Sequence, residues 1–207
     1  MSKITKAVFP VAGLGSRFFI TETAIKVFSV GYPIQAPLDA FLTLRRQHAL
    51  TPDNVERIVA RLPQDGARIV DNRAMPDVNL QYAVAVALID GTLSFDASHS
   101  YERMRDPQVL AAKQRVQLVG DRTLMDPAAP RSGRVDVTLR DGRTVSHFTR
   151  HAPGTKENPL DTAQVTAKAR ELMSPVIGDR RTEAVIERVN SLERLRSVRE
   201  LASLLAG

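Results

Sequence analysis

Cysteine and tryptophan are both missing from the 207 residues of this chain. The absence of cysteine excludes disulfides, thiol catalysis and cysteine-ligated metals, and it fits the cytoplasmic location that we expect. Long apolar runs are missing too: no stretch approaches the ~20 apolar residues needed to span a bilayer, and no charged-then-apolar signal opens the sequence. We therefore expect a protein with no membrane partner.

The charge is basic, but its pattern is not the one typical of nucleic-acid binding. Lysine and arginine number 29 against 23 acids, a net charge of +6, and aromatic residues make up only 5% of the chain. Because the arginines are scattered among acids, we interpret the excess as a solvated basic surface that favours small anions, and we expect no nucleic acid. The length suits one good-sized domain, alone or with a small helical appendage.

Two common catalytic signatures are absent as well. No serine has the Gly-x-Ser-x-Gly context of a serine hydrolase. None of the histidines shows the spacing of a metal site; they are His48, His99, His147 and His151. We therefore expect no metal.

Local signals predict short strands mixed with helices. Pro37 suits the first turn of a helix, and Gly91 suits the end of another. The clearest signal is Asp141-Gly142, a preferred two-residue hairpin turn, between residues 134–140 and 143–150. Further strands are predicted at 4–12, 23–29, 55–62 and 116–119, and helices at 37–47, 77–89, 106–113 and from 161 onward, with Pro175 and Gly178 separating the first two helices of the last group.

These elements predict an α+β fold, in which a small, mainly antiparallel sheet packs with helices and is followed by a helical C-terminal tail. We divide the chain into a head at 1–19, an α+β domain at 20–157 and a helical segment at 158–207. The apolar stripes of the helical segment exceed what a small sheet domain needs. We therefore expect a homo-oligomer, or a complementary helical partner, to cover them.

The head combines a strand-like run with a glycine-rich turn, Gly13-Leu14-Gly15-Ser16, which is the form of a phosphate-binding loop. The string KAVFPVAGLGSRF resembles the start of bacterial UTP–glucose-1-phosphate uridylyltransferases, and the match stops near Phe19. A nucleotidyltransferase also needs a metal-binding aspartate and a full α/β sheet, and neither is evident. Sugar-phosphate nucleotidyl transfer stays open as an alternative, which a doubly wound parallel sheet would favour.

Two further blocks place polar residues at the edge of a predicted helix: IKVFSVGYPIQAPLDA at 25–40 and MPDVNLQYAVAVALIDG at 75–91. In the first, Lys26 stands among apolar or small residues, where a lysine binds a carboxylate or acts as an acid or base. The alternative is an edge-strand lysine that prevents aggregation. In the second, the Tyr82 hydroxyl either donates to a developing negative charge or packs against a backbone carbonyl.

Together the two blocks resemble the C-terminal part of the MmgE/PrpD family, which includes 2-methylcitrate dehydratase, cis-aconitate decarboxylase and iminodisuccinate epimerase. The resemblance implies two catalytic residues, Lys26 and Tyr82, that converge on one cleft. It also implies four substrate-binding residues, which are Ser29, Gln35, Asn79 and Gln81. The chain departs from the commoner family pattern at Ser29, where proline is often found.

The resemblance further implies chemistry without a cofactor on small di- and tricarboxylates. A proton next to a carboxylate is removed, with loss of water or carbon dioxide or with inversion. Such a step needs a base that removes the proton and a hydrogen-bond donor that stabilises the departing or developing negative charge. It also needs cations that bind the carboxylates. The family's other acids, bases and histidines lie in a helical N-terminal half with no counterpart here. We therefore expect this chain alone to be inactive, and a non-catalytic interaction or structural module stays the other alternative.

Overall fold

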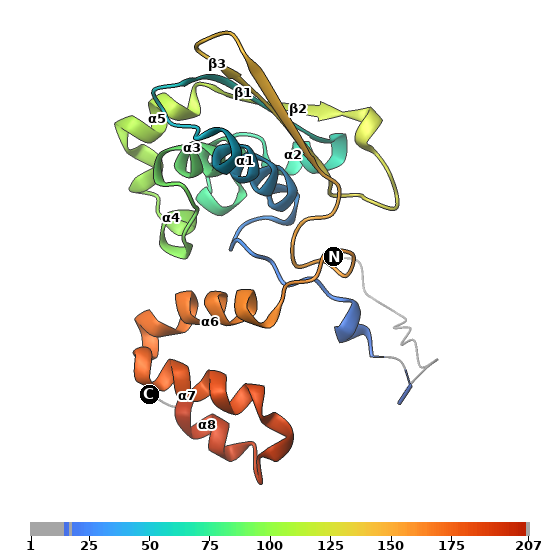
Figure 1. Cartoon of the computed structure of the whole chain (residues 1–207), viewed down its shortest axis with the longest axis vertical. Coiled ribbons are helices and arrows are strands. Elements are labelled where there is room, and N and C mark those ends of the chain that lie inside the picture. The colour runs from blue at the N-terminus through green and yellow to red at the C-terminus, as the bar shows by residue number, and fades with distance from the viewer. Residues whose placement is uncertain (1–14, 17, 206–207) are drawn as a thin grey trace, which may run out of the picture.

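The computed structural model describes residues 15–16 and 18–205, and it shows a body in which helices pack on a sheet, followed by a helical tail (Figure 1). The helices and strands of the body are α1 (Gln35–His48), β1 (Val55–Pro63), α2 (Gln64–Val70), α3 (Leu80–Asp90), α4 (Phe95–His99), α5 (Pro107–Lys113), β2 (Val116–Asp121), β3 (Gly133–Leu139) and β4 (Thr144–Thr149). The tail consists of α6 (Thr162–Ile177), α7 (Asp179–Asn190) and α8 (Arg199–Leu205).

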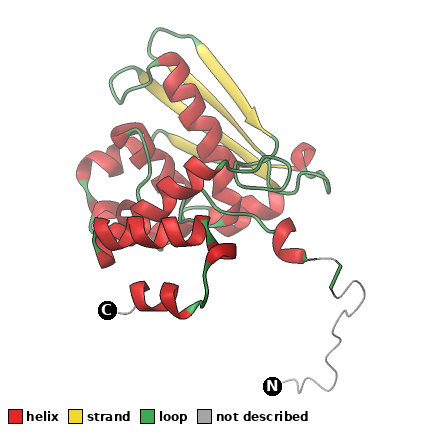
Figure 2. Ribbon diagram, turned by 60° about the horizontal axis from the view of Figure 1, so that its bottom comes forward, coloured by secondary structure: helices red, strands yellow, loops and turns green. Residues whose placement is uncertain are grey.

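The sheet has four strands in the order β2-β1-β3-β4. β3 pairs antiparallel with both β1 and β4, and β1 pairs parallel with β2. Helix α1 packs against β3 and β4, while α2 and α3 pack against β2, so these helices cover one face of the sheet (Figure 2). The predicted α+β fold with a mainly antiparallel sheet and a helical tail is therefore confirmed. The sheet is not the doubly wound parallel one that the nucleotidyltransferase alternative requires.

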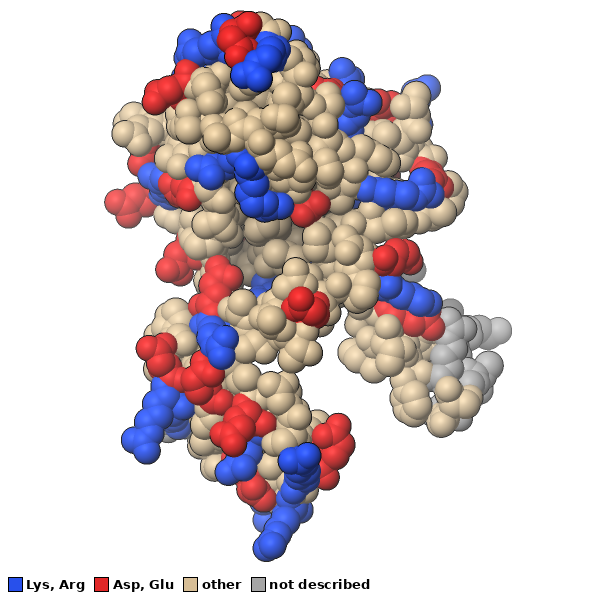
Figure 3. All heavy atoms as spheres, in the orientation of Figure 1, with Lys and Arg blue, Asp and Glu red and all other residues tan. Residues whose placement is uncertain are grey.

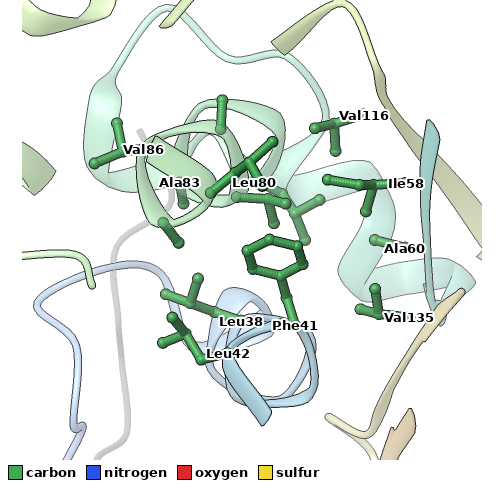
Figure 4. Close-up of a cluster of buried hydrophobic side chains, with 14 of the residues drawn as sticks. Leu38, Phe41, Leu42, Ile58, Ala60, Leu80, Ala83, Val86, Val116 and Val135 are labelled. Atoms are coloured by element: carbon green, nitrogen blue, oxygen red, sulfur yellow. The ribbon is translucent and has the colours of Figure 1, made fainter. Parts of the chain in front are cut away.

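The core lies between α1, α3 and the sheet. Phe41 of α1 points toward Leu80 of α3 and toward Ile58 and Val135 of the sheet (Figure 4). All four side chains are fully buried. Burying a side chain of this kind contributes roughly 1.5–3 kcal/mol, so this layer supplies the principal driving force for folding.

Helix α3 is the central helix of this core. Its residues from Leu80 to Leu88 are all buried, as expected for a helix that is apolar on every side. It begins at the Asn79 cap, whose side-chain oxygen accepts the backbone N–H of Tyr82 at 2.9 Å. It ends at Gly91, which adopts the left-handed conformation (φ +81°) that favours glycine. The predicted terminator is confirmed.

Four local predictions are wrong. The Asp141-Gly142 turn is not the expected two-residue one: the Leu139 carbonyl accepts the Gly142 N–H at 2.9 Å, so the loop spans 140–142, and a left-handed Gly142 lets Asp141 keep a negative φ. Residues 23–29 form no strand, and instead the Ile25 N–H donates to the Gly154 carbonyl at 2.8 Å, since no neighbouring strand offers a ladder. The second-block helix begins at Leu80 rather than at 77, after a 3₁₀ turn at Pro76–Val78. Pro175 lies inside α6 and does not separate it from α7; Gly178 alone does. The predicted strand at 4–12 and most of the glycine-rich turn lie outside the described residues.

The tail is packed differently from the body. Its helices contact one another in sequence order, α6 with α7 and α7 with α8. Only Thr182 and Val185 are buried in α7, and no side chain of α6 is buried. Several large apolar side chains stay exposed, among them Val176 (80%) and Val198 (72%). No helix in the described part of the chain is long and apolar enough to cross a membrane.

Candidate functional site

A cavity of about 750 Å³ lies between the body and α6. Its walls come from residues 27–28, from α1, from the loop at 92–94 and from α6 itself. Figure 3 shows the surface hollowed in this region, between the body and the tail. Much of the wall is apolar: Val27, Phe28, Leu42, Leu93, Pro153, Leu160 and Ala167. A volume of this size falls in the usual range for small-molecule sites.

Lys168 is the principal polar group on the α6 side of the cavity. Its ammonium group donates to the Val27 carbonyl oxygen at 3.0 Å and lies 3.5 Å from the Ser29 hydroxyl oxygen. Partial burial lowers the pKa of Lys168; the negative charge of Glu171 opposes that shift and the positive charge of Lys26 adds to it. Two lysines thus act on one another at the edge of this cavity.

The two acids of the cavity are already bonded to neutral groups. An Asp39 carboxylate oxygen accepts the Thr149 hydroxyl at 2.8 Å, and a Glu171 oxygen accepts the Phe95 backbone N–H at 2.7 Å. Within residues 18–205, no carboxylate lies at salt-bridge distance from Lys168 or from Arg46, the cavity's other cation. The cations therefore remain available to an anion.

The first predicted block lies beside this cavity. Lys26 is exposed and directly precedes the lining residue Val27, and Ser29 is half-buried near Lys168. Gln35 is buried, and its side-chain amide donates to the Phe28 carbonyl at 2.8 Å and accepts the Phe28 N–H at 3.2 Å. Gln35 therefore holds the segment that carries Lys26 and Ser29 in place.

The second block lies in the core. Tyr82 is fully buried, its hydroxyl donates to the Ala97 carbonyl at 2.5 Å, and burial raises the pKa of this phenol to about 12. Asn79, besides capping α3, donates to the Arg73 carbonyl at 2.6 Å. Gln81 donates to a carboxylate oxygen of Asp71 at 2.7 Å. None of the three lines the cavity between the body and α6.

The structure thus brings Lys26 and Ser29 to the edge of the cavity, and the hydrogen bonds of Gln35 to the Phe28 backbone hold their segment in place. It places Tyr82, Asn79 and Gln81 in the interior, where each makes a hydrogen bond within the fold. The catalytic and substrate-binding roles of all six residues stay predictions. No group of three or more histidine, aspartate or glutamate side chains that could hold a metal occurs among the residues that the structure describes.

Sequence reasoning missed Lys168. A signal was present, because this lysine stands three residues after Val165 and four before Leu172, so helical spacing places it beside two apolar residues. A lysine within an apolar stripe indicates a place where the helix faces a cavity or a polar partner. The acids and Arg46 carried no such signal.

Comparison with protein families gives one match. The model described as the MmgE/PrpD C-terminal domain matches residues 28–193, which include the sheet, the cavity-lining residues from Phe28 onward and both α6 and α7. No individual curated protein gives a significant match. The match does not address the head that resembles uridylyltransferases, and it begins two residues after Lys26. This chain belongs to the MmgE/PrpD family and carries its C-terminal domain.

Proposed function

We propose that this chain is the C-terminal portion of an MmgE/PrpD-type lyase that acts on small di- or tricarboxylates, as 2-methylcitrate dehydratase does. The observation that carries the proposal is the family match over residues 28–193. The exposed Lys26 beside the cavity supports it, because a polycarboxylate substrate needs cations.

In the proposed reaction a proton leaves the carbon next to a carboxylate, and a hydroxide departs from the neighbouring carbon as water. Lys26 is proposed as the acid–base or carboxylate-binding lysine. Tyr82 is proposed as the proton donor, since a phenol is protonated at neutral pH. In its buried position the pKa of this phenol is raised to about 12, which makes it a weaker acid there. Because its hydroxyl now donates to the Ala97 carbonyl, the role requires a movement of α4 that frees it.

A complete site on this proposal also needs groups from a helical partner. The exposed apolar side chains of the tail, including Leu192 and Val198, support an association surface of this kind. Covering such a patch contributes about 25 cal/mol per Å² of apolar area, so a few hundred Å² would add several kcal/mol to association. The partner is either a second copy of the chain or a complementary helical domain.

The test is a turnover assay on 2-methylcitrate and citrate, followed by the appearance of the unsaturated acid. The chain alone is expected to be inactive. Addition of the separately purified helical domain of a family dehydratase is expected to produce activity, which Lys26→Ala and Tyr82→Phe reduce and Lys113→Ala leaves unchanged. A monomer that dehydrates substrate unaided would contradict the need for a partner. A correctly associated complex without turnover would contradict the lyase assignment.

A further inference from the structure

The cavity between the body and α6 carries an unusual balance of charge. Its lining contains two cations, Arg46 and Lys168, and two acids, Asp39 and Glu171, so its formal charge is zero. The neighbouring Lys26, whose charge acts on Lys168, adds one positive charge. One negative charge on a ligand would neutralise the site, whereas two or three would be repelled by the fixed acids.

Lys168 is the group that such a ligand would reach. Its nearest partner is the neutral carbonyl of Val27, and Ser29 lies at the limit of hydrogen-bond distance. An ammonium group has three N–H donors, so at least one is free. Lys168 is partly buried and has no carboxylate at salt-bridge distance among residues 18–205, so it has lost hydration that a bound anion would replace.

Most of the remaining cavity wall is apolar, and this determines the chemistry of the part of the ligand that does not contact Lys168. Phe28 and Leu42 come from the body side, and Leu160 and Ala167 from the tail side. These side chains offer no donors or acceptors, so they favour hydrocarbon over the several hydroxyl and carboxylate groups of a citrate-like acid.

We propose that this cavity binds an amphipathic monocarboxylate, with the carboxylate on Lys168 and the hydrocarbon body against the apolar wall. This goes beyond the proposed lyase function, because it concerns a different class of ligand and involves no turnover. By joining α6 to the segment at 27–29 and to α1, the ligand would also fasten the tail to the body.

The test is calorimetric titration of the full chain with hexanoate, with hexanamide as the uncharged analogue and citrate as the polyanion. Wild-type chain is expected to bind hexanoate more tightly than the other two. Lys168→Gln keeps a donor for the Val27 carbonyl but removes the charge, and it should weaken hexanoate binding about tenfold or more while leaving hexanamide binding unchanged. Lys113→Gln, a lysine of similar exposure on α5 away from the cavity, is the matched control and should bind as wild type.

A second variant tests the cavity itself. Ala167 is an exposed lining residue, so Ala167→Phe is expected to fold normally, fill the space and abolish hexanoate binding. Hexanoate binding that is absent in wild type, or unaffected by either the Lys168 or the Ala167 variant, would overturn the proposal. Citrate binding more tightly than hexanoate through Lys168 would also overturn it and would make the cavity a polycarboxylate site, an outcome separate from any turnover result.

Discussion

Helices α3 and α6 are both well formed, yet they are stabilised in opposite ways. Every residue of α3 from Leu80 to Leu88 is buried, whereas no residue of α6 is buried. α6 has instead a capping box, in which Asp161 and Gln164 bond to each other's backbone N–H groups, and it meets the body through polar contacts from Lys168 and Glu171. The body therefore folds around apolar contacts, and the tail is held by caps, helix-to-helix contacts and a few hydrogen bonds.

This difference teaches that similar apolar patterns can serve different purposes. Apolar residues of the body meet the sheet and are removed from water, while those of the tail, such as Val189 and Leu205, remain about half exposed. Local opening costs least where few apolar contacts are buried. The tail is therefore the part of the chain expected to open first and to gain most from a ligand or partner.

The largest expected effect on stability comes from a leucine-to-alanine substitution in the body, compared with the same substitution in the tail. Leu38→Ala in α1 removes a fully buried side chain and should lower the free energy of unfolding by about 2–5 kcal/mol. Leu192→Ala in the tail removes a side chain that is 46% exposed and should cost less than about 1 kcal/mol. Urea denaturation followed by circular dichroism measures both. Equal losses would show that the tail shares the body's core and would break the comparison.

A smaller effect is expected at the junction of the two regions. Gly154 has φ +91°, and a Cβ there would lie 1.8 Å from the Ile25 carbonyl oxygen. Gly154→Ala should therefore cost more than the roughly 1–2 kcal/mol of left-handed strain alone and should disrupt the hydrogen bond from the Ile25 N–H. Gly142→Ala is the matched control, since Gly142 has φ +86° and no atom within 4 Å of the added carbon.

The measurement for this pair is the unfolding free energy together with limited proteolysis of residues 20–30. Gly154→Ala should expose this segment to cleavage, and Gly142→Ala should not. If the two variants lose the same stability and are cleaved alike, the backbone contact between Gly154 and Ile25 does not fasten the segment beside the cavity.

How far the sequence predicts this molecule depends on how local each signal is. The hairpin was predictable because Asp141-Gly142 marks a turn, although the turn type was not: the loop has three residues, and only Gly142 has a positive φ. Helix α1 was predictable because Pro37 suits the first turn of a helix. The parallel pairing of β1 with β2 was not, because the partners Ile58 and Val116 are far apart in the sequence and their register is set by packing.

The same limit applies to the candidate site. Lys26 and Ser29 could be singled out because they share one block with a recognisable pattern. The apolar neighbours of Lys168 on its helix could indicate that it faces a cavity or a polar partner, but they could not identify Val27, which lies 141 residues away in the sequence. The interior position of Tyr82 was also open from sequence, since the same pattern suits a hydroxyl in a cleft and one bonded to a backbone carbonyl.

A third prediction concerns the tail alone. Val185 is the buried apolar residue of α7, so Val185→Ala should remove about 1–2 kcal/mol of local stability. Because the tail is held apart from the body's core, the loss should appear in hydrogen exchange of the α6 and α7 amides and leave the α3 amides unchanged. Faster exchange in α3 as well would show that the two regions unfold as one unit.

The smallest expected effect is at Tyr82, where the body meets α4. Tyr82→Phe removes the hydrogen bond to the Ala97 carbonyl and should cost about 1 kcal/mol at neutral pH. The pKa of the phenol is raised by burial from 10.0 to about 12, so the folded state holds the proton more tightly than the unfolded chain does. The stability that this preference provides is complete below pH 10 and is lost as the pH rises toward 12.

Tyr82→Phe has no proton to lose, so its own stability should fall less over the same alkaline range, and the gap between variant and wild type should narrow. The measurement is the urea midpoint of both proteins from pH 7 to the alkaline limit of reversible unfolding. Parallel curves would mean that the hydroxyl titrates as freely as in water. The phenol would then be accessible without movement of α4, and its proposed role as a donor would need no opening of the core. A stability difference that narrows with rising pH would instead show that the Tyr82 hydroxyl stays buried in the body. The α6 side of the cavity is then the part of the candidate site that is open to solvent.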